Sequence, residues 1–315
     1  MIVAKYFAPI VLSSLFIILG TPADLIAVDY LYVTTTANTV ERYDVSSGDQ
    51  ATIEATRTIF ANGLAYPQDL AFDRNGNLFV ANFNTNSISK ITPSGSVSTF
   101  VTGLQGPIGL TFDSAGNLYS SNINNEFIYK ISPDGTKTEF VTSGLGGSQD
   151  LVTDQNDNLF IANVAGSVVK KITPSGSLST FATGLNEPVG LAFRSDGRLF
   201  ASNINGHNIS ILSESGAISN YANLYSSTSY PRGIVFDKNG YLYVANVNNI
   251  MRINQSGGID FAFRSGITSS SPRFLTFNTS FVPETSGSVM AIVSTFFVVM
   301  IRKMQAGRST MPASH

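Results

Sequence analysis

The sequence of 315 residues contains no cysteine, no tryptophan and only two histidines. The absence of cysteine excludes disulfides, thiolate metal sites and cysteine nucleophiles, so the fold must depend on its apolar core. Charged residues make up 13% of the chain and the net charge is −2, which leaves no basic surface for a nucleic-acid backbone. These shortages argue against a nucleic-acid partner and leave few groups for acid–base catalysis.

What the sequence has instead is an internal repeat of the type seen from Pro67 to Leu104. Its copies are separated by 40, 41, 40, 43 and 41 residues, and their first residues are Pro67, Pro107, Ser148, Pro188, Pro231 and Pro272. Each copy holds short alternating apolar runs closed by Gly, Asn, Asp or Pro, which predicts a meander of antiparallel strands. A period near 40 residues is typical of one propeller blade. The sequence therefore predicts an all-β, six-bladed β-propeller of four-stranded antiparallel blades.

The segment that precedes the first repeat lacks a proline-led first strand. Residues 30–34, 40–43 and 58–61 align with the second, third and fourth strands, with an insertion at 48–55. The missing first strand is found at the far end, at residues 273–277. We therefore expect one blade to be shared by N- and C-terminal strands, which removes the open edges of the ring.

The two ends of the chain predict export. Residues 1–27 carry Lys5, an apolar run over 6–19 and then small residues, the pattern of a signal peptide cleaved after Ala23 or Ala27. A transmembrane anchor is the alternative interpretation of this run. The propeller is expected to span residues 28–279 and a C-terminal segment to span 280–315.

The C-terminal segment contains Pro283 and Glu284, an apolar run over 289–301, and then Arg302 and Lys303. This order resembles the PEP-CTERM sorting signal of exosortase substrates, although Thr285 replaces a second proline and a polar tail follows. The resemblance implies cleavage by an exosortase-type protease and placement at the cell surface or outside the cell. A lasting membrane anchor through 288–301 is the alternative, and its run of about 20 Å is short for a crossing of about 30 Å.

The repeat motifs, such as PQDLAFD and ITPSGSVSTF, resemble NHL-repeat and gluconolactonase-like propellers and the streptogramin lyase repeats over residues 29–279. The resemblance implies the fold, but binding modules, lactonases and lyases all use these blades. In lactonases it implies a divalent cation at the axial mouth, with ligands directly after the motif proline. Here that row contains no carboxylate and consists of Gln68, Ile108, Gln149, Val189, Arg232 and Arg273.

Asp69 and Asp150 stand one position further on. If they face the channel they are candidates to hold a cation such as calcium, or a ligand hydroxyl; otherwise they cap the opening turns. A lyase would need a histidine base, but His315 lies in the tail and His207 in a rim turn. Five asparagines end second strands and either bind sugar or form turns: Asn82, Asn122, Asn163, Asn203 and Asn246.

We predict a secreted or cell-surface, non-enzymatic propeller that acts as a binding or scaffold module of the extracellular matrix. The ligand is expected to be a glycan, peptide or protein, and no cofactor is expected. The expected ligand-binding residues at the axial mouth are Gln68, Asp69, Gln149, Asp150, Arg232 and Arg273. The alternatives are a metal-dependent lactonase-like hydrolase, a streptogramin-lyase-like enzyme, and a purely structural matrix component.

Overall fold

The computed structural model describes residues 25–224, 230–263 and 272–283. The chain divides into two compact units, one spanning Val28–Ser280 and the other combining Met1–Ala27 with Phe281–His315. Most of the predicted signal peptide and of the C-terminal sorting segment lies outside the described residues. Among the residues that are described, no helix has the length and apolar character needed to cross a membrane.

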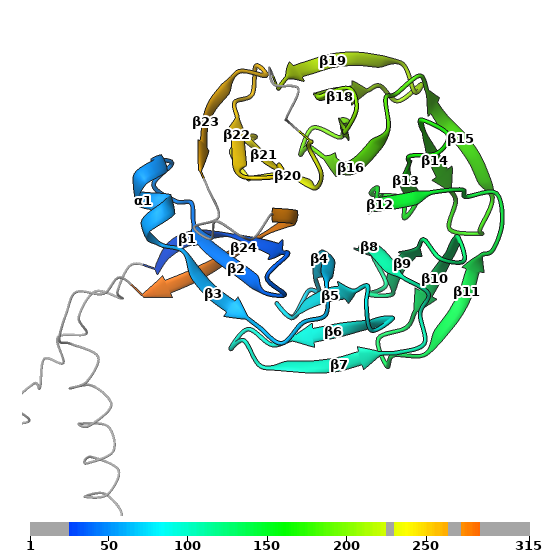
Figure 1. The fold of residues 1–315 in the computed structure, drawn as a ribbon, viewed down its shortest axis with the longest axis horizontal. Helices are drawn as coiled ribbons and strands as arrows, with labels where there is room; N and C mark the ends of the chain where they lie inside the picture. The colour runs from blue at the N-terminus through cyan, green and yellow to red at the C-terminus, as the bar shows by residue number, and fades with distance from the viewer. Residues whose placement is uncertain (1–24, 225–229, 264–271, 284–315) are drawn as a thin grey trace, which may run out of the picture. The chain divides into compact units, whose positions relative to one another are not determined.

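The unit Val28–Ser280 is a ring of six four-stranded antiparallel sheets, as predicted from the repeat (Figure 1). Blade 1 contains β4 (Pro67–Phe72), β5 (Leu78–Asn82), β6 (Ser87–Ile91) and β7 (Val97–Val101). Blade 2 contains β8 (Pro107–Phe112), β9 (Leu118–Asn122), β10 (Phe127–Ile131) and β11 (Lys137–Val141). Blade 3 contains β12 (Ser148–Thr153), β13 (Leu159–Asn163), β14 (Val168–Ile172) and β15 (Leu178–Thr183). Blade 4 contains β16 (Pro188–Phe193), β17 (Leu199–Asn203), β18 (Asn208–Leu212) and β19 (Ile218–Asn223). Blade 5 contains β20 (Ile234–Phe236), β21 (Leu242–Ala245), β22 (Ile250–Ile253) and β23 (Ile259–Phe263).

Blade 6 is the blade shared by both ends, and its strand order is β24-β1-β2-β3. The C-terminal strand is β24 (Pro272–Pro283), and the N-terminal strands are β1 (Leu25–Thr35), β2 (Val40–Asp44) and β3 (Thr58–Ala61). The predicted closure is therefore confirmed. The insertion before β3 forms the short helix α1 (Gln50–Ala55), which Asp49 caps by accepting the N–H of Thr52 at 2.9 Å.

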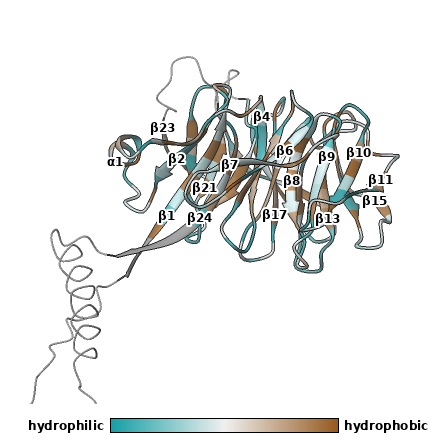
Figure 2. Ribbon diagram, turned by 90° about the horizontal axis from the view of Figure 1, so that it is seen from below, coloured by the Kyte–Doolittle hydropathy of each residue, from teal (hydrophilic) through white to brown (hydrophobic). Residues whose placement is uncertain are grey.

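Polar turn residues fix the register of each blade. In blade 1, Asp73 Oδ1 accepts the N–H groups of Asn75 and Asn77 at 2.9 and 2.8 Å and so closes the turn between the first two strands. Gly95, with φ of 87°, closes the hairpin between the last two. Figure 2 shows hydrophobic residues along the strands and hydrophilic residues in the turns at both ends of the ring.

Aromatic side chains join neighbouring blades. Phe193 on the first strand of blade 4 contacts Phe160 on the second strand of blade 3 edge to face, with ring centroids 5.4 Å apart. Phe181 contacts Phe160 from within blade 3 at 4.9 Å, and the ammonium of Lys171 lies 5.2 Å from the Phe160 ring. The same first-to-second-strand ring contact recurs at Tyr32–Phe72, Phe79–Phe112, Phe200–Phe236 and Tyr243–Phe277. Such pairs stabilise the blade interfaces beyond the area that they bury.

Candidate functional site at the axial mouth

The first strands are innermost in the ring, so the residues that follow the motif openings meet around the axis at one end (Figure 1). We call this end the axial mouth. Its outer layer is the mouth row, which consists of Gln68, Ile108, Gln149, Val189, Arg232 and Arg273. The second layer, one residue deeper, consists of Asp69, Gly109, Asp150, Gly190, Gly233 and Phe274.

Ring closure brings the polar members Arg232, Arg273 and Gln68 onto three successive blades. Arg273 Nη1 donates to Gln68 Oε1 at 3.0 Å, a contact between residues 205 positions apart. The guanidinium carbon of Arg273 lies 3.9 Å from the centre of the Tyr66 ring. Burial lowers the pKa of Arg232, and the nearby charge of Arg273 lowers it further. The described residues place no carboxylate in an ion pair with either arginine.

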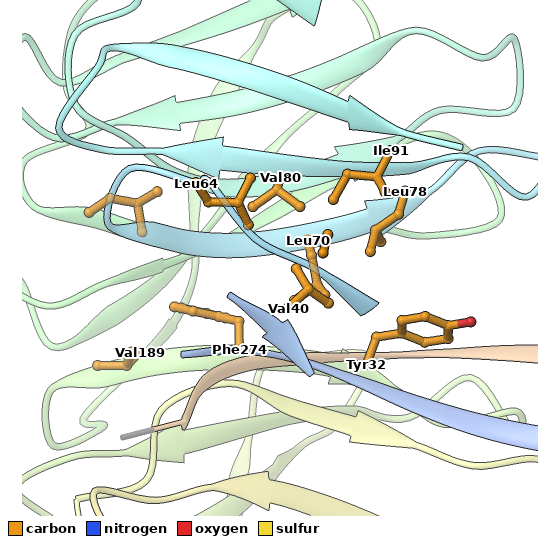
Figure 3. Close-up of a cluster of buried hydrophobic side chains, with 11 residues drawn as sticks. Tyr32, Val40, Leu64, Leu70, Leu78, Val80, Ile91, Val189 and Phe274 are labelled. Atoms are coloured by element: carbon orange, nitrogen blue, oxygen red, sulfur yellow. The ribbon is translucent and has the colours of Figure 1, made fainter. Parts of the chain in front are cut away.

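The rest of the mouth is largely apolar. Ile108, Val189 and Phe274 are buried in one cluster with residues of blades 1 and 6 (Figure 3). Partly buried side chains that pack against this cluster come directly after the asparagines of the second strands, and they are Phe83, Ile123, Val164 and Ile204. Gln149, from the blade between those of Ile108 and Val189, is half-buried. The mouth thus combines a cationic arc with an apolar arc.

Asp69 and Asp150 face the axis, and backbone amides occupy both oxygens of each. Asp69 accepts the N–H of Leu70 and the N–H of Leu110 in the next blade, each at 2.7 Å. Asp150 accepts the N–H of Leu151 and the N–H of Leu191 in the next blade, each at 2.8 Å. Each aspartate therefore ties two blades together.

Hydroxyl groups link neighbouring blades at three other junctions. We call these side chains the hydroxyl row, and they are Ser121, Ser202 and Thr34. Ser121 donates to Gln149 O of the next blade at 2.5 Å and accepts the N–H of Gly109 at 2.9 Å. Ser202 donates to Arg232 O, and Thr34 donates to Gln68 O, each at 2.5 Å. The remaining junction uses the backbone alone, because the N–H of Gly233 donates to Arg273 O at 2.9 Å. Hydroxyl and carboxylate junctions therefore alternate around five of the six interfaces.

The two carboxyl groups also interact with each other. Burial raises the pKa of Asp69 well above its ordinary value, and the charge of Asp150 raises it further. Burial raises the pKa of Asp150 to about 7. Both carboxyls therefore keep their protons to a higher pH than an exposed aspartate does.

Below the pair is an axial cavity of about 440 Å³, which also reaches the apolar side chains of the six first strands. The donor set does not fit a divalent cation, since both carboxylates already accept two amides and the row above carries two cations. Within the described part of the chain no group of three or more His, Asp or Glu side chains could hold a metal. The structure thus brings Asp69 and Asp150 together but adds no third ligand.

Four of the five asparagines at the ends of the second strands hold the incoming loops, whereas Asn203 donates to Asn208 and Ser210 of the third strand. Asn82 accepts the N–H of Ala65 and Asn122 that of Gln105, each at 3.0 Å, and Asn246 accepts that of Tyr230 at 2.7 Å. These bonds confirm that the asparagines have a structural role. A bond from the asparagine to its own turn was also expected, and the described residues show it only in some blades, as where Val247 N–H donates to Asn246 Oδ1. The asparagine side chains can bond to these loops because each loop passes beside the end of the second strand on its way to the first strand.

His207 lies in the turn between β17 and β18 with φ of 48°. The equivalent turns also place a non-glycine residue at positive φ, namely Asn86, Glu126 and Ser167. The imidazole of His207 contacts the Tyr230 ring edge to face, with centroids 5.5 Å apart. His207 therefore occupies the rim turn expected from the sequence.

Sequence reasoning missed Tyr66 and the hydroxyl row. A signal for the row was present, because the residue before the second-strand asparagine alternates in blades 1 to 4 as Ala81, Ser121, Ala162 and Ser202. It alternates in step with Asp69, Gly109, Asp150 and Gly190 of the second layer. This two-blade period could have identified the aspartates as junction residues.

The chain matches the Virginiamycin B lyase family model over residues 34–280. It belongs to that family. No curated protein sequence matches it.

Several solved structures share its fold. A nidogen/laminin complex is 17% identical and has a TM-score of 0.71, and the match covers 79% of this chain and 98% of that chain. A catalytically inactive histidine-to-alanine variant of the virginiamycin B lyase from Staphylococcus aureus, with quinupristin, is 20% identical at a TM-score of 0.60, covering 80% and 92% of the two chains. A gluconolactonase from Xanthomonas campestris is 15% identical at a TM-score of 0.62, covering 83% and 94%. At these identities the likeness shows the fold alone.

Proposed function

We propose that this protein is an exported, non-enzymatic member of the family that acts at the cell surface or in the extracellular matrix and binds its ligand at the axial mouth. The observation that carries the proposal is that the carboxyl groups of Asp69 and Asp150 already bind backbone amides. Each of their four oxygens accepts a backbone N–H, so the acidic groups on the axis serve the blade junctions. That leaves the polar groups of the mouth row for a ligand, and two of them, Gln149 and Arg232, are half-buried rather than buried.

The choice of histidine also supports a binding role. The solved virginiamycin B lyase is described as catalytically inactive when one histidine is replaced by alanine. This chain has two histidines. His315 lies in the C-terminal tail, and His207 lies in a rim turn. His207 contacts the Tyr230 ring in that rim turn, while the carboxyls on the axis accept backbone amides.

A propeller of the same fold that stands in a complex with another protein is a precedent for a binding role. The similar propeller with the highest TM-score among the three above is in a complex of nidogen and laminin. Export follows from the predicted signal at 1–27 and the sorting motif at Pro283 and Glu284. We accordingly assign the ligand to the matrix or the cell surface, as a glycan, peptide or protein.

The experiment uses the full chain purified without chelator. Its metal content is measured, and gluconolactone and quinupristin turnover are assayed with and without calcium, magnesium or zinc. We expect substoichiometric metal and no turnover above buffer, together with saturable retention of the labelled chain by isolated extracellular matrix.

Metal-stimulated turnover that is lost in Asp69→Ala or Asp150→Ala, but retained in the exposed control Asp134→Ala, would instead establish the enzyme alternative. Circular dichroism of each variant separates loss of activity from loss of fold. Absence of retention by the matrix in a folded chain would contradict the binding role.

A further inference from the structure

The arginines of the mouth differ from three of the four other half-buried arginines of the described chain, while the fourth, Arg42, lies over the rings of Tyr30 and Phe60. Arg57 contacts Glu41 at 2.6 Å, Arg194 contacts Asp196 at 2.7 Å, and Arg252 contacts Asp260 at 3.1 Å. Each of these cations has a carboxylate partner, whereas Arg232 and Arg273 have none among the described residues. The difference calls for a physical explanation, because burying an unpaired charge is costly.

Arg273 is the more deeply buried of the two arginines. Only 8% of its surface is exposed, and its Nε is buried without a hydrogen-bond partner in the described structure. Its contacts are neutral: one hydrogen bond to the Gln68 amide oxygen and the face of Tyr66. Neither contact compensates the full positive charge or fills the remaining donors of the guanidinium.

Arg232 adds a second cation beside it. The two backbones are joined by the bond from Gly233 N to Arg273 O, so the blades themselves hold the two side chains on adjacent first strands. Among the described residues, neither Asp69 nor Asp150 forms an ion pair with either arginine. Two adjacent, half-desolvated guanidinium groups favour an anion that accepts hydrogen bonds from both.

The neighbours of the two arginines indicate what the anion is attached to. Phe274, the residue after Arg273, is buried with Ile108 and Val189 in the cluster beneath the mouth. Tyr66 is 37% exposed and presents the ring on which Arg273 stacks. An oxyanion carried on an apolar or flat body would contact the exposed ring of Tyr66 while its charge meets the arginines.

We propose that Arg232 and Arg273 form an oxyanion subsite of the axial mouth that takes a carboxylate carried on an apolar body. The inference rests on the proposed binding function and specifies its ligand chemistry.

The test follows the melting temperature of the full chain in sodium benzoate, sodium acetate and inorganic phosphate, with chloride keeping the ionic strength constant. Benzoate at about ten times its Kd should raise the melting temperature by about 3–6 °C, since ligand binding to the native state shifts Tm by mass action. Acetate should bind less tightly than benzoate, because it lacks the apolar body. Arg232→Gln and Arg273→Gln should abolish the shift, whereas the exposed control Arg74→Gln should retain it.

A benzoate shift of equal size in both mouth variants and in Arg74→Gln would overturn the proposal, as would the absence of any shift in the wild type. Phosphate that binds more tightly than benzoate would overturn the assignment of a carboxylate. If Arg273→Gln does not fold, Arg232→Gln carries the test, since its side chain is only half-buried. Matrix retention without a benzoate shift would refute this subsite alone, and quinupristin turnover with an intact benzoate shift would refute the proposed function alone.

Discussion

The raised pKa values of Asp69 and Asp150 should make the protein less stable as the pH rises from acidic to neutral. The pKa of Asp150 is raised from 3.8 to about 7, and that of Asp69 is raised as well. Because the folded-state pKa exceeds the unfolded one, the native chain holds a proton that the unfolded chain has released. The stabilisation is therefore complete below about pH 4 and is lost as the pH rises through about 7.

The magnitude follows from the displacement of the pKa. A change from 3.8 to about 7 corresponds to about 4 kcal/mol of unfolding free energy. The pKa of Asp69 is raised as well, so Asp69 contributes in the same direction. It is a large part of the total stability of a typical domain, about 5–15 kcal/mol.

Urea unfolding followed by circular dichroism, at about pH 5 and at about pH 8, measures the effect. The double variant Asp69→Asn with Asp150→Asn should lose most of the pH dependence in this window. It should also be less stable at the lower pH by about 1–3 kcal/mol for each amide N–H left without an acceptor. The control is Asp134→Asn, since a hydrogen bond from Ser132 lowers the pKa of that carboxyl out of the window. Equal pH dependence in the wild type and the double variant would refute a proton held by the pair.

Three further outcomes are expected. Gly190→Ala should destabilise the chain by about 1–3 kcal/mol or more in urea unfolding, because the new Cβ would overlap the carbonyl oxygen of Arg232 in the next blade. Gly184→Ala meets open space but has φ of 92°, so backbone strain alone should cost about 1–2 kcal/mol. Deleting residues 28–45 removes β2 and nearly all of β1 and leaves β24 without its neighbour, so the melting temperature should fall by many degrees, and a nearly unchanged value would contradict the role of the shared blade. Mass spectrometry of surface material should find a C-terminus near Thr285, whereas an intact tail through His315 would favour a lasting anchor.

The fold could be predicted almost completely from the sequence because each repeat contains the residues that form its own turns. The hairpin glycine recurs in phase in blades 1 to 5 and the first-turn aspartate in four of these blades, and both act locally, as at Gly95 and Asp73. The shared blade could also be predicted, since one set of strands lacked a first member and the other lacked the rest. Local turn chemistry and strand counting suffice for these features.

The site was harder to predict, because its contacts cross between blades. Gln68 and Arg273 are 205 positions apart, and only closure of the ring makes them neighbours. The sequence could place Asp69 and Asp150 near the axis but could not show which donors their oxygens accept. Those donors are backbone amides of the next blade, which carry no residue-specific signal.

The alternation around the axis gives the two acids at the centre of the ring a structural role. Where a blade has alanine before the second-strand asparagine, as at Ala81, no hydroxyl can reach the next blade, and Asp69 spans the junction instead. Where the blade has Ser121, the residue at the aspartate position is Gly109, whose Cβ would lie 2.7 Å from the Gln149 carbonyl oxygen. Hydroxyl and carboxylate are thus two solutions to one structural requirement. An aspartate that must accept two amides to hold the ring closed cannot be redirected to a metal or substrate without opening a blade junction, so new chemistry at this mouth is confined to the row above it, where Arg232 and Arg273 lie.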